Sequence, residues 1–202
     1  MKFKNYLNEE IDIDVVYNIL IRDCGSFIKE WKKIKPPRFL LSGRRSYNGD
    51  FKKFYTRIDR RPTDLPIDVH NLIDMWFKKK FGVKARSKSV FATFDYGTAD
   101  FYGLPYLIFP IGNYKTIHSD KVIDLYSIYS TIRRNIIHTT DYDSASYEDK
   151  LLIKKSIMAE LNKSNYTDKF EFTNSEIMLA CKEYYLVDYK HNYNLHDKFT
   201  IK

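Results

Sequence analysis

The feature that most constrains the fold is an apolar run near the end of the chain that begins with an acid. The run extends from Glu176 to Val187, and its Ile, Met, Leu, Cys, Tyr and Val side chains are typical of a buried strand. Burying an unpaired carboxylate is costly, so an acid seldom opens such a strand unless it faces solvent or a site. Glu176 is therefore either a surface acid at the strand start or a functional carboxylate, and both interpretations stay open.

Helical and strand-like patterns alternate along the rest of the chain. Apolar residues at helical spacing predict one amphipathic helix over 11–33, and a second helix is expected to have Thr63 or Asp64 as its cap and to end at Gly82. Shorter helices are expected at 97–102 and 122–129, and a longer one follows the capping box of Ser146 and Asp149. Strands are expected at 39–41, 89–93, 106–111, 170–172 and 176–187.

These elements predict a single α+β domain that spans residues 1–202, without internal repeats or linkers. Within it we expect a helical region at 1–35, an α+β core at 36–190 and a polar tail at 191–202. The chain is long enough to bury a core, and its content of 44% hydrophobic and 16% aromatic residues excludes a disordered protein.

Composition also indicates the compartment. The only cysteines, Cys24 and Cys181, lie in apolar segments, which argues against a disulfide framework and favours a reducing compartment. Neither a signal-peptide core nor a membrane-spanning apolar stretch occurs, so we expect a cytoplasmic protein without membrane contact. The Lys-, Tyr-, Ile- and Asn-rich usage is typical of an AT-rich genome, such as that of a bacteriophage. For a phage protein the expected compartment is the host cytoplasm.

The formal net charge of +8 favours anionic partners. One stretch mixes cations with aromatic residues, as proteins that bind single-stranded nucleic acid do. It predicts a patch for nucleic acid or an acidic partner, with a solvated surface as the alternative. The patch residues are Lys52, Lys53, Arg57, Arg60 and Arg61.

Strong catalytic signatures are absent from the sequence. It contains no Cys/His zinc pattern, no phosphate-binding Gly-rich loop and no Gly-x-Ser-x-Gly motif. His191 and His196 lie near Asp197, but their spacing is weak evidence for a metal site. We therefore expect no metal.

Three blocks, taken in order, resemble the ADP-ribosyltransferase family. They are 39–45, 86–112 and 172–187, and the closest local match is SVFATFDYGTADFYG at 89–103. Members of that family place an Arg or His on a first strand, a Ser/Thr or aromatic residue on a second strand and a Glu on a late strand. The resemblance implies a split β-sheet core with an N-terminal helix and flanking helices.

The resemblance also implies roles for residues. Glu176 matches the catalytic glutamate, which stabilises the positive charge that develops when NAD loses nicotinamide, and Asn174 matches the position that helps to choose the acceptor. Arg44 follows Ser42-Gly43, where the family more often has an Arg or His before the Gly, and it becomes the candidate to hold the NAD phosphates. The remaining candidates for contact with NAD are Ser89, Phe91, Thr93 and Tyr102.

Bland alternatives stay open for these residues, because aromatic side chains on apolar strands are usually part of the core and Arg44 can be a solvated loop cation. The leading hypothesis is a phage-encoded mono-ADP-ribosyltransferase that uses NAD as its substrate and modifies a host protein or nucleic acid. The alternative is a non-enzymatic phage protein: an inhibitor of a host factor or defence, a nucleic-acid-binding module or a virion component. The enzyme requires Arg44, Ser89 and Glu176 to converge.

Overall fold

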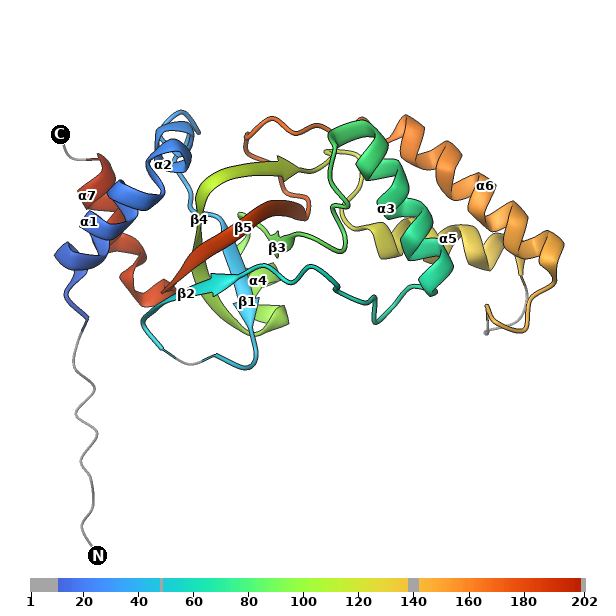
Figure 1. The fold of residues 1–202 in the computed structure, drawn as a ribbon, viewed down its shortest axis with the longest axis horizontal. Coiled ribbons are helices and arrows are strands. Elements are labelled where there is room, and N and C mark those ends of the chain that lie inside the picture. Colours follow the sequence, from blue (N-terminus) through green and yellow to red (C-terminus); the bar gives the residue numbers. More distant parts are fainter. Residues whose placement is uncertain (1–10, 48, 138–141, 201–202) are drawn as a thin grey trace, which may run out of the picture.

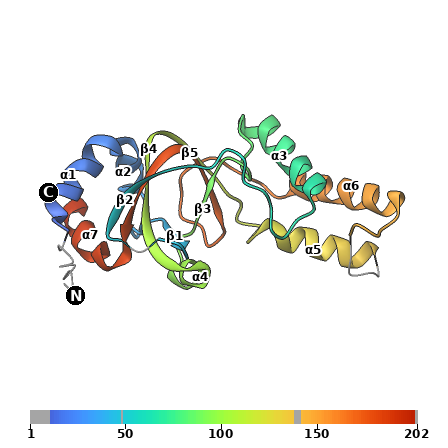
Figure 2. The same cartoon turned by 60° about the horizontal axis from the view of Figure 1, so that its bottom comes forward.

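The computed structural model describes residues 11–47, 49–137 and 142–200, which form one α+β domain (Figure 1). A five-stranded antiparallel sheet lies in the middle of an elongated molecule, with one group of helices at each end (Figures 1 and 2). The predicted fold class is confirmed. The described helices include none that is long and apolar enough to cross a membrane.

The sheet is built around two long strands that pair along most of their length, β4 and β5. Its path runs β1-β4-β5-β2, and β3 pairs with the first part of β5. Leu41 in β1 also exchanges backbone hydrogen bonds of 2.7 and 2.9 Å with Thr93, directly after β3. Strands β1, β4, β5 and β3 therefore close into a ring. The strands are β1 (Leu41–Arg44), β2 (Phe51–Tyr55), β3 (Val90–Ala92), β4 (Leu104–Ile117) and β5 (Ile177–Asp188).

Three helices from the beginning and the end of the described chain cover one end of the sheet, namely α1 (Ile13–Asp23), α2 (Gly25–Trp31) and α7 (Asn192–Thr200) (Figure 1). The single helix predicted over 11–33 is wrong, because Cys24 leaves helical geometry (φ −118°, ψ 19°) and separates α1 from α2. The Cys24 thiol turns inward, 3.8 Å from the carbonyl oxygen of Phe109 in β4. The break thus lets both helices pack on the sheet.

The predicted polar tail at 191–202 is also wrong for its described part. A 3₁₀ turn (Tyr189–His191) leads into α7, whose Leu195 and Phe199 are completely buried. The Phe199 ring packs against Trp31 of α2 at a centroid distance of 5.7 Å. Two apolar residues four positions apart are enough to dock this otherwise polar helix.

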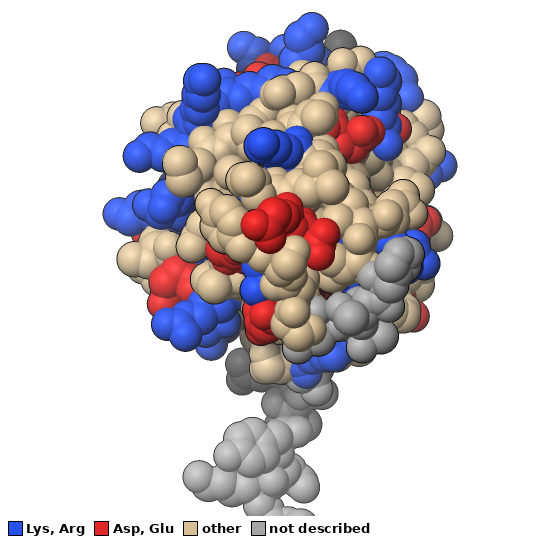
Figure 3. Space-filling view, turned by 90° about the vertical axis from the view of Figure 1, so that its right-hand side faces the viewer, with Lys and Arg blue, Asp and Glu red and all other residues tan. Residues whose placement is uncertain are grey.

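A second core lies at the opposite end, where three helices pack around Ile117 and Met178 from the tips of β4 and β5. The helices are α3 (Ile67–Phe81), α5 (Leu125–Ile136) and α6 (Tyr147–Lys163). Figure 3 views this end, and Lys and Arg side chains are interspersed there with acidic and uncharged ones.

The caps of these helices test the predicted boundaries. Gly82 ends α3 in the left-handed region (φ 79°) and Ser146 caps α6 by accepting the Asp149 N–H at 3.1 Å, so both predictions are confirmed. Thr63 and Asp64 do not cap α3, because Pro66 holds that position and the Thr63 hydroxyl donates to the Asp64 carboxylate instead. Residues 170–172 are irregular in the structure, in contrast to the predicted strand, and the short helix α4 (Tyr96–Tyr102) forms as expected.

Candidate functional site

The strand register places the candidate residues on one face of the sheet. Phe91 is paired with Met178, and Phe54 with Tyr184, so all four side chains share the face on which the even-numbered residues of β5 lie. Arg44 reaches the same face, because its guanidinium Nη2 donates to the Tyr184 hydroxyl at 2.9 Å. We call this side of the sheet the Tyr184 face; Tyr184 and Met178 themselves are buried in it.

Glu176 lies just before β5, at the end of the Tyr184 face nearest the second core. Its backbone N–H donates to the carbonyl oxygen of Ile123 at 3.0 Å, and the Thr173 hydroxyl accepts the Ser175 N–H at 3.1 Å. These bonds fix the turn that presents the carboxylate. The interpretation of Glu176 as a fully exposed surface acid does not hold, since the side chain is only partly accessible.

Protein atoms crowd the Glu176 carboxyl, and this burial raises its pKa to about 7. The positive charges of Arg86 and Arg60 lower the pKa, while the negative charge of Asp124 raises it further. Among the described residues, however, no side chain lies within hydrogen-bond or ion-pair distance of the carboxylate. Glu176 is thus an enclosed carboxylate that keeps its oxygen atoms free for a ligand.

Arg60 and Arg86 lie against the Phe91 ring, and their charges act on Glu176. Their guanidinium carbons are 4.0 and 5.5 Å from the centre of the Phe91 ring. Although Arg60 reaches solvent, burial lowers its pKa, and the charges of Arg86, Arg44 and Arg57 add to that effect, with Glu176 opposing it. Two guanidinium groups, those of Arg60 and Arg86, therefore act on the Glu176 carboxylate, and two more, those of Arg44 and Arg57, lie near Arg60. This gathering of positive charge favours an anionic ligand.

A buried polar cluster holds Arg86 in place. The Asp74 carboxylate of α3 accepts the backbone N–H groups of Arg86 and Ser87 at 2.8 and 3.3 Å, and it also accepts the Ser87 hydroxyl. His70 Nε2 lies 2.9 Å from that hydroxyl oxygen, and burial lowers the pKa of the imidazole. The sequence analysis missed Asp74 and His70, although polar residues one turn apart on the buried face of a helix were a usable signal.

Gly43 brings α4 onto β1, and with it Tyr102 to the site. A Cβ atom at position 43 would lie 2.1 Å from the carbonyl oxygen of Ala99, so only glycine permits this approach. Tyr102 remains 53% exposed, and both burial and the Glu176 charge raise the pKa of its hydroxyl. The Glu176 charge therefore reaches the Tyr102 hydroxyl.

Arg44 is more than a loop cation. Besides its bond to the Tyr184 hydroxyl, its guanidinium carbon lies 5.5 Å from the centre of the Tyr184 ring, and its Nε is buried without a partner among the described residues. The charges of Arg44 and Glu176 both shift the pKa of Arg60, so both candidates lie near this arginine.

The other candidates differ in their surroundings. Ser89 is buried, and its hydroxyl has no hydrogen-bond partner among the described residues, whereas the buried Thr93 hydroxyl accepts the Asp95 N–H at 3.0 Å in the turn before α4. Phe91 is partly exposed, so it is not simply a core ring, and Asn174 is exposed. Thr93 is thus occupied by a structural bond, while Ser89 retains its bonding capacity.

The predicted basic patch divides into parts. Arg60 belongs to the Glu176 surroundings, while Lys53 is paired with Glu183 at 2.6 Å on the other side of β2. Lys52, Arg57 and Arg61 are exposed. An open hollow of about 430 Å³ lies next to Arg60 in the chain, lined by Arg61, Pro62, Leu65 and Ile67.

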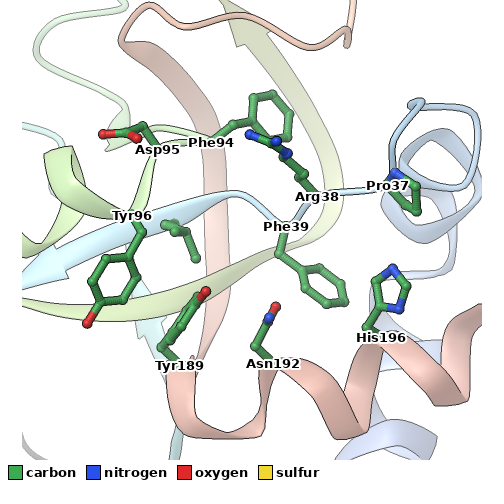
Figure 4. Close-up of a pocket in the computed structure, with 10 residues that line it drawn as sticks. Pro37, Arg38, Phe39, Phe94, Asp95, Tyr96, Tyr189, Asn192 and His196 are labelled. Atoms are coloured by element: carbon green, nitrogen blue, oxygen red, sulfur yellow. The ribbon is translucent and has the colours of Figure 1, made fainter.

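A second hollow, of about 300 Å³, is separate from this site. It forms where the segment before β1, the start of α4 and the end of the chain meet, and its lining includes Arg38, Tyr96, Tyr189 and His196 (Figure 4). None of the arginines around Glu176 lines it. No cluster of three or more His, Cys, Asp or Glu side chains suited to a metal ion occurs in the part of the chain that the structure describes.

The arrangement can bind an anionic, partly planar ligand and offer it an unpaired carboxylate. The cations supply the charge, and Phe91 and Tyr102 supply accessible rings. Comparison of the chain with protein-family models, with curated proteins and with solved structures found no match in any of the three.

Proposed function

We propose that the protein is a mono-ADP-ribosyltransferase that cleaves NAD and transfers ADP-ribose to an acceptor. The observation that carries the proposal is the enclosed, unpaired carboxylate of Glu176 beside Phe91 and the cations Arg60 and Arg86. The late position of Glu176 before an apolar strand is the position of the catalytic glutamate in the family that the sequence resembles. Both observations support Glu176 as the catalytic residue of the proposed enzyme.

The proposed reaction breaks the bond between C1′ of the ribose and the nicotinamide ring nitrogen. The electron pair of that bond goes to the ring, which leaves as neutral nicotinamide, and C1′ then bonds to the acceptor nucleophile, which loses a proton. The ribose passes through an oxocarbenium-like state, as in glycoside hydrolysis. An ionised Glu176 that accepts a hydrogen bond from a ribose hydroxyl stabilises this positive charge.

The surrounding residues supply binding. The pyrophosphate of NAD pairs with Arg44, Arg60 and Arg86, since one planar guanidinium group can donate to two phosphate oxygens at once. Phe91 or Tyr102 stacks on the nicotinamide, and the unpaired Ser89 hydroxyl orients the ribose or Glu176. Asn174, exposed two residues before Glu176, contacts the acceptor. In this assignment Thr93 keeps its bond to the Asp95 N–H and does not touch NAD.

The acceptor is a macromolecule, either a protein or a nucleic acid, and in a phage-encoded protein it belongs to the host. The test is to incubate the purified protein with labelled NAD and a bacterial lysate and to follow label in protein and nucleic-acid fractions. Wild type is expected to transfer label, and Glu176→Ala is expected to lose it. Glu171→Ala, which removes an exposed acid from the same loop, is the matched control and should retain transfer. Equal labelling by wild type and Glu176→Ala would refute the catalytic role.

A second candidate function is non-enzymatic binding of an anion. The observation in its favour is the gathering of guanidinium groups around Arg60 and the Phe91 ring. Calorimetry with NAD and with ADP-ribose separates the two functions. A binding protein holds the ligand and leaves NAD intact, while the transferase releases nicotinamide.

A further inference from the structure

The cations on the Tyr184 face continue well beyond the Glu176 surroundings. Lys52 covers the Phe54 ring at 5.7 Å, Phe54 stacks on Tyr184 at a centroid distance of 5.8 Å, and Arg44 bonds to Tyr184. Lys182 lies two residues before Tyr184 in β5, so its side chain is on the same face; it is exposed and extends this face toward Glu176. A row of positive charges therefore leads from β2 to Glu176.

The backbone explains why this row is continuous. Strands β2 and β3 pair with the same edge of β5, at 183–187 and 177–179. The segment after β2 bridges the gap, because the Thr56 N–H donates to the Lys182 carbonyl oxygen at 3.0 Å and Arg60 then reaches Phe91. At about 3.3 Å per residue, β5 spans at most roughly 26 Å between Tyr184 and Glu176.

The charges of the row are available to a ligand. Among the described residues, Lys52, Arg57 and Lys182 have no carboxylate within ion-pair distance, and all of them are exposed. Arg57 lies close enough to Arg60 for its charge to lower the Arg60 pKa. A polyanion of suitable length can neutralise these cations together.

Aromatic rings distinguish the chemistry of that polyanion. Phe54 and Phe91 are partly exposed on the Tyr184 face, and each has a cation over its ring. Alternating cations and accessible rings suit single-stranded nucleic acid, whose phosphates meet the cations while its bases stack on the rings. An acidic protein offers the charge but no bases to stack.

We propose that the Tyr184 face between Lys52 and Glu176 is a binding surface for single-stranded nucleic acid. Its length suits a site of about four or more nucleotides. The idea that the bound strand accepts ADP-ribose rests on the proposed transferase function, whereas the idea that the strand binds here does not. One end of the surface meets the carboxylate of Glu176, so a strand lying on it is presented to the proposed reaction centre.

The test is fluorescence anisotropy with the full chain and labelled oligothymidylate or oligouridylate of about 12 nucleotides, without NAD. Wild type is expected to bind either strand, with affinity that falls steeply between about 50 and 200 mM salt. The triple variant Lys52→Glu, Arg57→Glu, Lys182→Glu is expected to weaken binding at least about tenfold and to flatten the salt slope by about 2, at ~0.7 per lost phosphate contact.

The matched control makes the same charge change elsewhere. Lys78→Glu, Lys79→Glu, Lys155→Glu alters exposed lysines of α3 and α6 and should leave affinity within about twofold, because salt screens distant charges. Phe54→Leu is expected to weaken binding about fivefold or more through lost stacking, while Tyr55→Leu, on the other face of β2, should not. Circular dichroism confirms that each variant is folded.

Two results overturn the proposal. The first is equal binding by the triple variant Lys52→Glu, Arg57→Glu, Lys182→Glu and by the control triple variant. The second is displacement of the oligonucleotide by polyglutamate at equal charge concentration, which would indicate an acidic protein as partner. Failure of the transferase is distinguishable, because binding of the oligonucleotide is measured without NAD and does not depend on turnover. Binding without transfer of ADP-ribose to the strand when NAD is added overturns the acceptor role.

Discussion

The guanidinium carbon of Arg60 lies 4.0 Å from the centre of the Phe91 ring, and the Arg60 charge lowers the pKa of Glu176. This contact joins the segment after β2 to β3, two parts of the chain that pair with the same edge of β5. A partly desolvated cation over an aromatic ring contributes about 1–2 kcal/mol. Phe91 thereby holds a positive charge beside the carboxylate while leaving part of its ring accessible.

Replacing Phe91 tests this arrangement. Phe91→Leu keeps an apolar side chain but removes the ring that holds Arg60 and stacks on nicotinamide, so we expect the KM for NAD to rise about fivefold or more and the free energy of unfolding to fall by about 1 kcal/mol. Phe91→Tyr retains the ring and should stay close to wild type in both measurements. Steady-state NAD cleavage and urea unfolding provide the values, and equal KM values for Leu and Phe would contradict a stacking role.

The free energy of unfolding should depend on pH through Glu176. Its pKa rises from the usual 4.5 to about 7 in the folded protein, so between these values the unfolded state binds fewer protons than the folded state. Stability contributed by the neutral carboxyl is therefore complete below about pH 4.5 and is lost as the pH rises to about 7. Glu176→Gln should be more stable than wild type by about 1–3 kcal/mol at pH 8, with little difference at pH 4. Urea titrations at both pH values measure this, and a variant that is less stable at pH 8 would disagree.

Asp74 is expected to act through Arg86. Asp74→Ala leaves two backbone N–H groups and the Ser87 hydroxyl without their acceptor, which should lower the free energy of unfolding by about 2–3 kcal/mol. The milder Ser87→Ala removes only one of these donors and should cost about 1 kcal/mol. If Asp74 positions Arg86, the KM for NAD rises in Asp74→Ala at temperatures where the variant is still folded. An unchanged KM would limit Asp74 to a structural role.

Gly43 and Gly25 form a matched pair for stability. Gly43→Ala forces a Cβ atom against the Ala99 carbonyl oxygen, so we expect a loss of about 2–3 kcal/mol together with displacement of Tyr102. A Cβ atom at position 25 meets nothing within 4 Å at the start of α2, and Gly25→Ala should be neutral or stabilise by up to about 1 kcal/mol. Differential scanning calorimetry compares the two variants. Equal melting temperatures would show that α4 can move away from β1 without cost.

Local patterns in the sequence predicted much of this architecture. The apolar run after Glu176 forms β5, and the segment at 89–103 forms β3 and α4 as expected. The short edge strand β2 was not predicted, because two lysines separate Phe51 from Phe54 and Tyr55 and leave no strict alternation of apolar and polar residues. The helix α7 was missed for a similar reason, since its buried surface comes from only two large apolar side chains.

The site shows the same limit. Glu176, Arg44 and Tyr102 were predicted as site residues from their places in the blocks; in the structure the charges of Arg44 and Glu176 act on Arg60, and the charge of Glu176 acts on Tyr102. Arg60 was assigned to a surface patch and Arg86 was given no role of its own, because their proximity to Phe91 depends on how two loops pack together. Long-range contacts of this kind leave no spacing in the sequence, whereas a carboxylate at the head of an apolar strand does.

The most direct test of the central claim is the rate of nicotinamide release from NAD by Glu176→Gln, measured by chromatography across pH 5–9. Wild type should release nicotinamide at a rate that rises with pH through about 7, as the carboxyl loses its proton. Glu176→Gln should be at least about 100-fold slower at every pH, since it lacks the charge that stabilises the oxocarbenium-like state. Glu171→Gln should retain the wild-type rate and profile. Release by Glu176→Gln at the wild-type rate, or no release by wild type, would contradict the account.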